Sequence, residues 1–212
     1  MLVSYNWLKQ YTNVEDNAAD LAEKITRGGI EIEGVDYLAE ELSNVVVGYV
    51  ESKEKHPDAE KLNVCQVNVG EEENLQIVCG APNVDAGQYV IVAKVGAKLP
   101  GIKIKKAKLR GVESQGMICS LAELGLSKSV VPKNYQEGIY VFETEQELGS
   151  DVVEVLGLND YILDLSITPN RADALSMRGL TYELGALYNN KVDFKDVETE
   201  ENYEATSLQV VM

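Results

Sequence analysis

The middle of the chain is a series of short β-type segments separated by glycines, and this pattern restricts the fold most strongly. Residues 62–69 alternate apolar and polar side chains, as a half-buried strand does. Similar segments cover residues 45–50, 75–79, 89–93 and 102–110. The glycines that separate the segments are Gly70, Gly80, Gly87, Gly96, Gly101, Gly111 and Gly116. About five strands in roughly 100 residues, closed by tight turns, predict a small β-barrel.

The N-terminal flank of this region is predicted to be a helix followed by a strand. Asp16 or Asn17 can cap the helix. Gly28 and Gly29 supply its end, and the alternating residues 30–35 follow as a strand. The residues that share the apolar face of the helix are Ala18, Leu21, Ala22 and Ile25.

The C-terminal flank is predicted to run from a strand into a helix. Residues 161–167 have the pattern of a strand, and residues 168–171 are expected to form a loop because Pro169 disfavours helix at Thr168. A helix is then expected to end near residues 189–190. Its apolar stripe consists of Met177, Leu180, Leu184 and Leu187. A shorter helix is expected at residues 121–124.

Each flank has only about 40 to 60 residues, which is marginal for a core of its own. We therefore expect an α+β fold in which a five-stranded barrel at residues 40–150 is inserted into one small α+β domain. Residues 1–39 and 151–200 would form that domain. Residues 206–211 begin another strand pattern, so residues 201–212 are expected to start a further, truncated domain.

Charge is distributed unevenly along the chain. The formal net charge is −16, which argues against binding nucleic acid through bulk electrostatics. Between residues 94 and 110, however, there are seven cations and no acidic residue. These residues, which we call the basic island, are Lys94, Lys98, Lys103, Lys105, Lys106, Lys108 and Arg110.

Several classes of protein are disfavoured by the sequence. The three cysteines, Cys65, Cys79 and Cys119, belong to no CxxC motif, so buried reduced thiols are expected. A single histidine, His56, makes a metal site improbable. No apolar run approaches the roughly 20 residues that span a bilayer, and the N-terminus lacks the pattern of a signal peptide. We therefore expect a cytoplasmic protein without membrane contact.

Two strings carry a resemblance to a known family. Residues 56–62 read HPDAEKL, and residues 110–117 read RGVESQGM. Together, in this order, they resemble the OB-fold tRNA-binding domain shared by several synthetases and by stand-alone tRNA-binding proteins. The resemblance implies tRNA as a partner. The candidate contact residues are Lys61, Lys103, Lys105, Lys106, Arg110, Ser114 and Gln115.

Structural roles compete with contact for some of these residues and their neighbours. The alternating lysines could form a solvated strand edge. His56 is expected to be a structural loop residue, and Glu113 could form a local ion pair with Arg110.

A second string resembles a more specific family. Residues 160–176 read DYILDLSITPNRADALS, which is similar to a segment of the β subunits of bacterial phenylalanyl-tRNA synthetases. Residues 4–8 and 28–33 also resemble the start of that subunit. We interpret Asp173 as a helix N-cap and Asp164 as a residue at the edge of a strand, rather than as a metal pair.

The second resemblance implies a ligase that joins phenylalanine to tRNA with ATP and Mg²⁺, in an α2β2 assembly with an α subunit. The same resemblance implies no catalytic site, cofactor or metal within these 212 residues.

Two alternatives share the barrel motifs. One is a stand-alone tRNA-binding or chaperone-like OB protein, and the other is the OB appendix of methionyl-tRNA synthetase. Both should lack residues 168–173, TPNRAD, and the helix that follows. The presence of this segment favours the synthetase β subunit.

Overall fold

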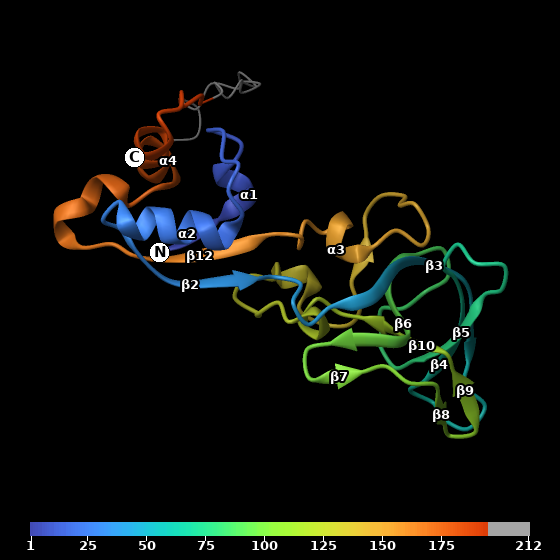
Figure 1. Cartoon of the computed structure of the whole chain (residues 1–212). Helices are drawn as coiled ribbons and strands as arrows, with labels where there is room; N and C mark the ends of the chain where they lie inside the picture. Colours follow the sequence, from blue (N-terminus) through green and yellow to red (C-terminus); the bar gives the residue numbers. More distant parts are fainter. Residues whose placement is uncertain (195–212) are drawn as a thin grey trace, which may run out of the picture. The chain divides into compact units, whose positions relative to one another are not determined.

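The computed structural model describes residues 1–194, and the chain divides into two compact units. The central unit comprises residues 37–160, and the flank unit comprises residues 1–36 together with residues 161–194. Figure 1 shows both units coloured along the sequence. That they correspond to domains with the expected boundaries stays a prediction. The expected strand at residues 206–211 and the expected further domain lie outside the described residues.

The central unit is built on an antiparallel sheet with the order β10-β6-β3-β4-β5. Four of the expected strands are present, two of them longer than expected, whereas the strand at residues 116–119 was not predicted. The strands are β3 (Ser43–Lys55), β4 (Asn63–Asn68), β5 (Leu75–Cys79), β6 (Tyr89–Leu99) and β10 (Gly116–Cys119). Two short strands, β7 (Ile102–Lys103) and β11 (Val141–Phe142), also pair with β6.

Apolar side chains cover both faces of this sheet. Val45 and Val47 of β3 pack in one core cluster, whereas Val46 and Val50 pack in another. Successive side chains of a strand point to opposite faces, so the continuous apolar run of β3 requires burial on both sides. Elements outside the sheet complete the unit. They are the 3-10 helices η1 (Ala122–Leu124) and η2 (Lys133–Tyr135) and the helix α3 (Val152–Val155).

The sheet curls, so that its two edge strands approach each other (Figure 1). The backbone N–H of Gln115, next to β10, donates to the carbonyl of Gln76 in β5 at 2.8 Å. The N–H of Val78 donates to the hydroxyl of Ser114 at 3.0 Å. The central unit is therefore a curled, mostly antiparallel half-barrel.

The expected basic strand at residues 102–110 is not continuous. It is divided into β7 and β8 (Ala107–Leu109), and β8 pairs with β9 (Val112–Ser114) as a separate hairpin. Ile104 causes the break, because it is buried and exchanges backbone hydrogen bonds with the chain at Gly96 and Ala97. The free energy gained by burying the Ile104 side chain outweighs the tendency of the alternating residues to form one continuous strand.

The flank unit combines helices with a three-stranded sheet in the order β1-β12-β2. The strands are β1 (Leu2–Ser4), β12 (Tyr161–Ser166) and β2 (Glu31–Tyr37), and the helices are α1 (Tyr5–Leu8), α2 (Ala18–Arg27) and α4 (Met177–Tyr188). The expected cap of α2 is confirmed, since the Asn17 side chain accepts from the N–H groups of Ala19 and Asp20. The chain thus has the expected α+β composition.

Three expectations for the C-terminal flank were wrong. Residues 169–174 form a 3-10 helix, η3 (Pro169–Ala174), instead of a loop. Thr168 is extended, as a residue before proline should be, but proline itself suits the first position of a helix. The N-cap of α4 is Ser176, whose hydroxyl accepts from Gly179 N–H at 3.0 Å, and not Asp173. Asp164 lies in the central strand β12, where it pairs with the N-terminal ammonium group at 3.3 Å.

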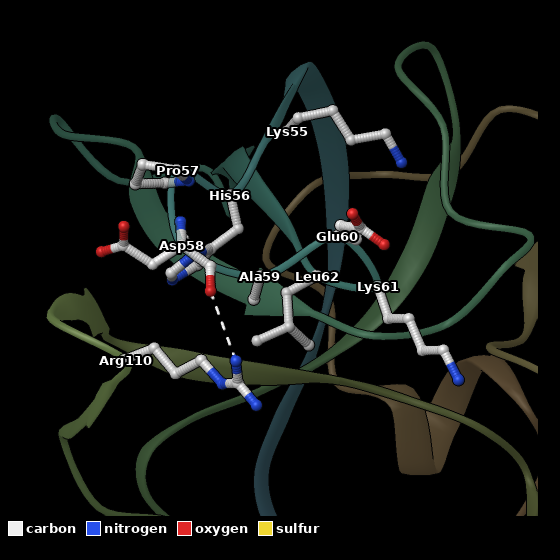
Figure 2. Close-up of a pocket in the computed structure, with 9 residues that line it drawn as sticks. All are labelled: Lys55, His56, Pro57, Asp58, Ala59, Glu60, Lys61, Leu62 and Arg110. Carbon is white, nitrogen blue, oxygen red and sulfur yellow. Dashed lines mark hydrogen bonds between the residues drawn. The ribbon is translucent and has the colours of Figure 1, made fainter.

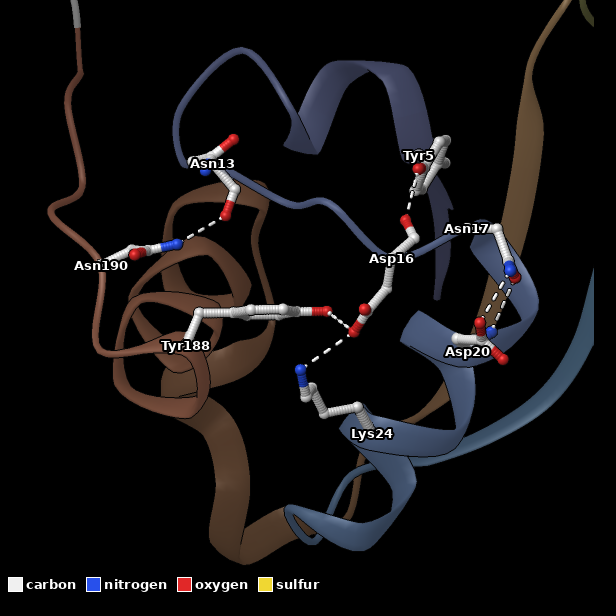
Figure 3. A network of polar contacts seen from close by, with 8 residues as sticks. All are labelled: Tyr5, Asn13, Asp16, Asn17, Asp20, Lys24, Tyr188 and Asn190. Atoms are coloured by element: carbon white, nitrogen blue, oxygen red, sulfur yellow. Dashed lines mark hydrogen bonds and ion pairs between the residues drawn. The ribbon is translucent and has the colours of Figure 1, made fainter.

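A polar network joins the helices of the flank unit (Figure 3). The Asp16 carboxylate accepts from the Tyr188 hydroxyl at 2.7 Å and from Lys24 Nζ at 2.9 Å. The hydrogen bond from Tyr188, and next the one from Lys24, lower the pKa of Asp16 below its ordinary value. Since the carboxylate is fixed between α2 and the end of α4, the network orients the two helices toward each other.

Candidate nucleic-acid interface

The two sequence motifs of the central unit lie against each other. His56 and Asp58 are in the loop between β3 and β4, whereas Leu109 and Arg110 are in the β8–β9 hairpin. The imidazole Nε2 of His56 lies 3.0 Å from the carbonyl oxygen of Leu109, 53 positions along the chain. Arg110 Nη1 donates to the carbonyl of Asp58 at 3.3 Å. The fold therefore brings both motifs into one site.

An open groove of about 770 Å³ lies between these two segments, and Figure 2 shows the side chains around it. We call it the motif groove. Its lining residues are Lys55, His56, Pro57, Asp58, Ala59, Glu60, Lys61, Leu62 and Arg110. Apolar atoms of Ala59 and Leu62 lie between the loop backbone and Arg110 (Figure 2). The groove thus offers an apolar surface flanked by mobile cations, a combination that suits a nucleotide.

The backbone of the hairpin presents Arg110 at its tip. Arg110 has φ 43° and Gly111 has φ 90°, and these two residues alone connect Leu109 to Val112. Two successive positive φ values match a type I′ turn, whose twist fits antiparallel strands. Glycine adopts this conformation freely, but arginine does so at a cost. Arginine in a left-handed turn beside a groove is therefore a candidate functional residue.

The structure separates the expected contact residues into different places. Lys61 and Arg110 line the motif groove. Lys103 and Lys105 are exposed on either side of the buried Ile104. Lys106 lines a second groove of about 610 Å³ together with Gln115. Contact of these residues with tRNA stays a prediction.

Carboxylates neutralise part of the basic island. Lys94 Nζ lies 3.1 Å from Glu71, and Lys106 Nζ lies 2.7 Å from Glu113. The expected pair of Glu113 with Arg110 was wrong, because Arg110 lies in the turn whereas Lys106, directly before β8, reaches Glu113. The hydrogen bond from Lys106 lowers the pKa of Glu113.

Ser114 and Gln115 are engaged within the fold. Ser114 is 3% exposed, and its hydroxyl donates to the Gly116 carbonyl while accepting from Val78 N–H. The Gln115 side chain accepts from the N–H of Gln76 at 3.2 Å. Both side chains help to hold the edge strands together, and their expected contact with tRNA stays a prediction.

Sequence reasoning missed Lys55 as a cation of the site, and it placed Lys94 in the basic island without the acidic residues that face it. Lys55 lines the motif groove at the end of β3, and Lys94 faces the acidic residues 71–73 across the second groove. Lys55 directly precedes the first motif, so its position next to His56 was an available signal. The partner of Lys94 follows from the curl of the sheet, which no local pattern encodes.

The cysteines are buried and free, as expected. Burial raises the pKa of Cys119 to about 12 and that of Cys65 to about 11, so both thiols are protonated at neutral pH. Residues 1–194 contain no group of three or more histidine, cysteine, aspartate or glutamate side chains that could hold a metal ion. None of the helices in this part of the chain has the length and apolar character needed to cross a membrane.

Comparison with known proteins supports a nucleic-acid-binding site in the central unit. Residues 45–151 match the family model described as putative tRNA binding domain. The chain is 60% identical over 193 residues to the phenylalanine–tRNA ligase beta subunit of Staphylococcus aureus strain Mu50, covering 91% of this chain and 24% of that protein. The corresponding subunit of Staphylococcus haemolyticus is 57% identical over 211 residues, covering 99% of this chain and 26% of that protein.

Two solved structures share weaker similarity. The C-terminal domain of Plasmodium vivax p43 is 36% identical with a TM-score of 0.31, covering 37% of this chain and 45% of that one. A MetRS related protein from Pyrococcus horikoshii is 25% identical with a TM-score of 0.35, covering 50% of this chain and 85% of that one.

The chain spans about a quarter of the length of the curated relatives that it matches. The family model covers half of the chain, including both motifs and the groove between them. This chain therefore belongs to the putative tRNA binding domain family.

Proposed function

We propose that this chain is the tRNA-binding part of a phenylalanine–tRNA ligase β subunit. The observation that carries the proposal is the motif groove, where Arg110 and Lys61 from separate motifs flank one apolar surface. The name of the Staphylococcus relatives supports the assignment, since their similarity covers 91% to 99% of the chain.

The intact protein would act as an enzyme together with an α subunit in an α2β2 assembly. It would join phenylalanine to its tRNA with ATP and Mg²⁺ in the cytoplasm. Within residues 1–194 no carboxylate cluster fits Mg²⁺, so we derive no catalytic step from these residues. Their role in the proposal is to hold the tRNA.

The proposal includes a five-stranded OB-type barrel made from β3, β4, β5, β6 and β10. The hydrogen bond between Gln115 and Gln76 supports closure of the curled sheet at its edge strands. In such a barrel the loop after the first strand and the loop before the fifth strand border the nucleic-acid site. The motif groove lies between residues 55–62 and Arg110, which occupy these two loops.

The two barrel-only alternatives account for less of the chain. A stand-alone OB protein or a methionyl-tRNA synthetase appendix would explain the central unit alone. The flank unit contains the TPNRAD segment in η3 and the following helix α4, and the Staphylococcus similarity extends over it. This coverage favours the phenylalanine–tRNA ligase.

The overall charge of −16 restricts how this surface can bind RNA. Long-range attraction is weak, so binding depends on close contacts between phosphates and a few exposed cations. Salt should weaken the complex, because each phosphate contact releases counterions.

The first prediction concerns the basic island. Replacement of Lys103, Lys105, Lys106 and Arg110 by glutamine should weaken tRNA binding. Each lost phosphate contact should lower the slope of log affinity against log salt by about 0.7 to 0.9. The measurement is the Kd for a phenylalanine-accepting tRNA transcript across a salt series.

A matched control replaces four exposed cations outside both grooves, Lys9, Lys128, Lys133 and Lys191, by glutamine. Both variants have the same net charge. We expect the control variant to retain most of its affinity for tRNA. An equal loss of affinity in both variants would mean that the effect comes from net charge alone. An unchanged affinity and slope in the first variant would reject the basic island as the contact surface.

A further inference from the structure

His56 is almost completely buried although it belongs to an exposed loop. Its side chain is 4% exposed, and both ring nitrogens have partners. The backbone N–H of Asp58 donates to Nδ1 at 3.0 Å, so Nδ1 must be unprotonated. Nε2 therefore carries the hydrogen and donates it to the carbonyl of Leu109 at 3.0 Å. The contacts select one neutral tautomer of the ring.

One of these hydrogen bonds lies within the loop, and the other connects the two sides of the motif groove. The bond to Asp58 shapes the loop that carries Lys61, and the bond to Leu109 holds the residue directly before Arg110. Within residues 1–194, one further hydrogen bond crosses the groove, from Arg110 to the Asp58 carbonyl, and Arg110 is exposed. Among the groove-lining residues, the buried imidazole is therefore the firm connection between the loops.

We propose that His56, in its neutral form with the hydrogen on Nε2, is a positioning residue that fixes the spacing of Lys61 and Arg110 for RNA. This inference rests on the proposed function of the motif groove. His56 itself need not touch the RNA, since its ring faces the protein. It affects the affinity for RNA through Lys61 and Arg110, because its hydrogen bonds fix the positions of the loop and of the hairpin that carry them.

Protonation of the ring would break this arrangement. In the imidazolium form both nitrogens are donors, so Nδ1–H would face the N–H of Asp58 at hydrogen-bond distance. The turn from His56 to Asp58 would have to rearrange, whereas Nε2–H would still donate to the Leu109 carbonyl. The charged groups that line the groove around the ring are Lys55, Asp58, Glu60 and Lys61 from the loop and Arg110 from the hairpin.

Two substitutions separate the two hydrogen bonds. In His56→Asn, the side-chain oxygen can accept from Asp58 N–H as in an Asx turn, but the amide is too short to reach Leu109. In His56→Gln, the terminal NH₂ can reach toward Leu109 without an acceptor at the Nδ1 position. Both variants retain all the charged groups of the groove.

Affinity for a phenylalanine-accepting tRNA transcript is measured for the wild type and both variants under one set of conditions. His56→Asn should bind about threefold to tenfold more weakly than the wild type, as expected for one lost hydrogen bond. His56→Gln, which retains a donor toward Leu109, should lose less. Equal affinity of the wild type and His56→Asn, or no recovery in His56→Gln, would overturn the proposal.

A second measurement does not depend on RNA. His56 is the single histidine of the chain, so its imidazole ¹⁵N signals can be assigned without ambiguity. At neutral pH we expect Nε2 protonated and Nδ1 unprotonated, and a ring protonated on Nδ1 would overturn the proposal even if a variant failed to fold. If the ring has the expected tautomer but the wild type does not bind tRNA, the proposed function fails instead.

Discussion

At the scale of single residues, the strained backbone of Arg110 points to a functional role for its side chain. Its left-handed backbone costs of the order of 1 kcal/mol, yet the turn needs this conformation to connect β8 to β9. Asparagine adopts the same conformation at less cost. An arginine at this position therefore has a reason other than stability, and its guanidinium at the rim of the motif groove provides one.

Replacement of Arg110 by asparagine should separate the charge from the turn. We expect weaker tRNA binding and a salt slope lowered by about one, with stability unchanged within about 0.5 kcal/mol. Gly111→Ala is the complementary variant, because it retains the guanidinium but strains a residue with φ 90°. Salt-dependent binding and urea unfolding measure both effects. If Arg110→Asn bound as tightly as the wild type, Arg110 would not contact phosphate.

Single residues were predictable where their role depends on close neighbours in sequence. Asn17 as a cap candidate is confirmed by hydrogen bonds within three positions. His56 has one such local bond, to Asp58, but its second bond, to Leu109 53 positions away, was not predictable. The partner of Glu113 was not predictable. Lys106, Lys108 and Arg110 all precede it, and the hairpin register decides which cation reaches it.

At the element scale, the junction between η3 and α4 is tightly packed. A Cβ atom added to Gly179 would lie 1.8 Å from the carbonyl oxygen of Asp173. Arg171 ties the same junction together by pairing with Asp173 at 3.2 Å and with Glu183 at 2.7 Å. The absence of a side chain at Gly179 is therefore what allows the sharp turn from η3 into α4.

Gly179→Ala tests this junction. Alanine normally stabilises a helix relative to glycine by about 0.5 to 1 kcal/mol. Here the clash with backbone should dominate and destabilise the flank unit by about 1 to 3 kcal/mol. The fluorescence of Trp7, the single tryptophan, reports urea unfolding of that unit.

Gly34→Ala in β2 is the control for this substitution, since no atom lies within 4 Å of the added Cβ. Its unfolding midpoint should stay near that of the wild type. A Gly179 variant as stable as the wild type would contradict the tight junction.

Elements with a clear periodic pattern were predictable, and those set by a single buried residue were not. The apolar faces of α2 and α4 follow from helical spacing, and β4 follows from strict alternation. The division of residues 102–110 depends on Ile104, which the tertiary fold draws into the core. Local patterns do not show where such a side chain finds its partners.

At the scale of the whole molecule, the acidic residues that set the net charge lie outside the segment that carries the basic island. The acidic residues dominate the total, whereas the cations of the basic island lie within 17 positions of the central unit, from Lys94 to Arg110. Two of these cations are neutralised by Glu71 and Glu113. The remaining exposed cations must therefore act over short distances, which favours a defined RNA contact over general attraction.

The motif groove was predictable only in part. Both motifs and most of the cations could be identified from the sequence, because they depend only on residue types and spacing. It did not show that Lys61 and Arg110 flank one groove while Lys106 belongs to another. That difference arises from the curl of the sheet and the register of the β8–β9 hairpin, which bring distant segments together.

The central claim is that tRNA binds in the motif groove. The most direct test is to titrate the ¹⁵N-labelled chain with a phenylalanine-accepting tRNA transcript and to follow backbone amide signals. We predict that the signals of residues 55–62 and of Arg110 shift or broaden first, while those of β1 and β12 in the flank unit change little. Changes confined to the flank unit, or no change at residues 55–62 and Arg110 under conditions of binding, would contradict the claim.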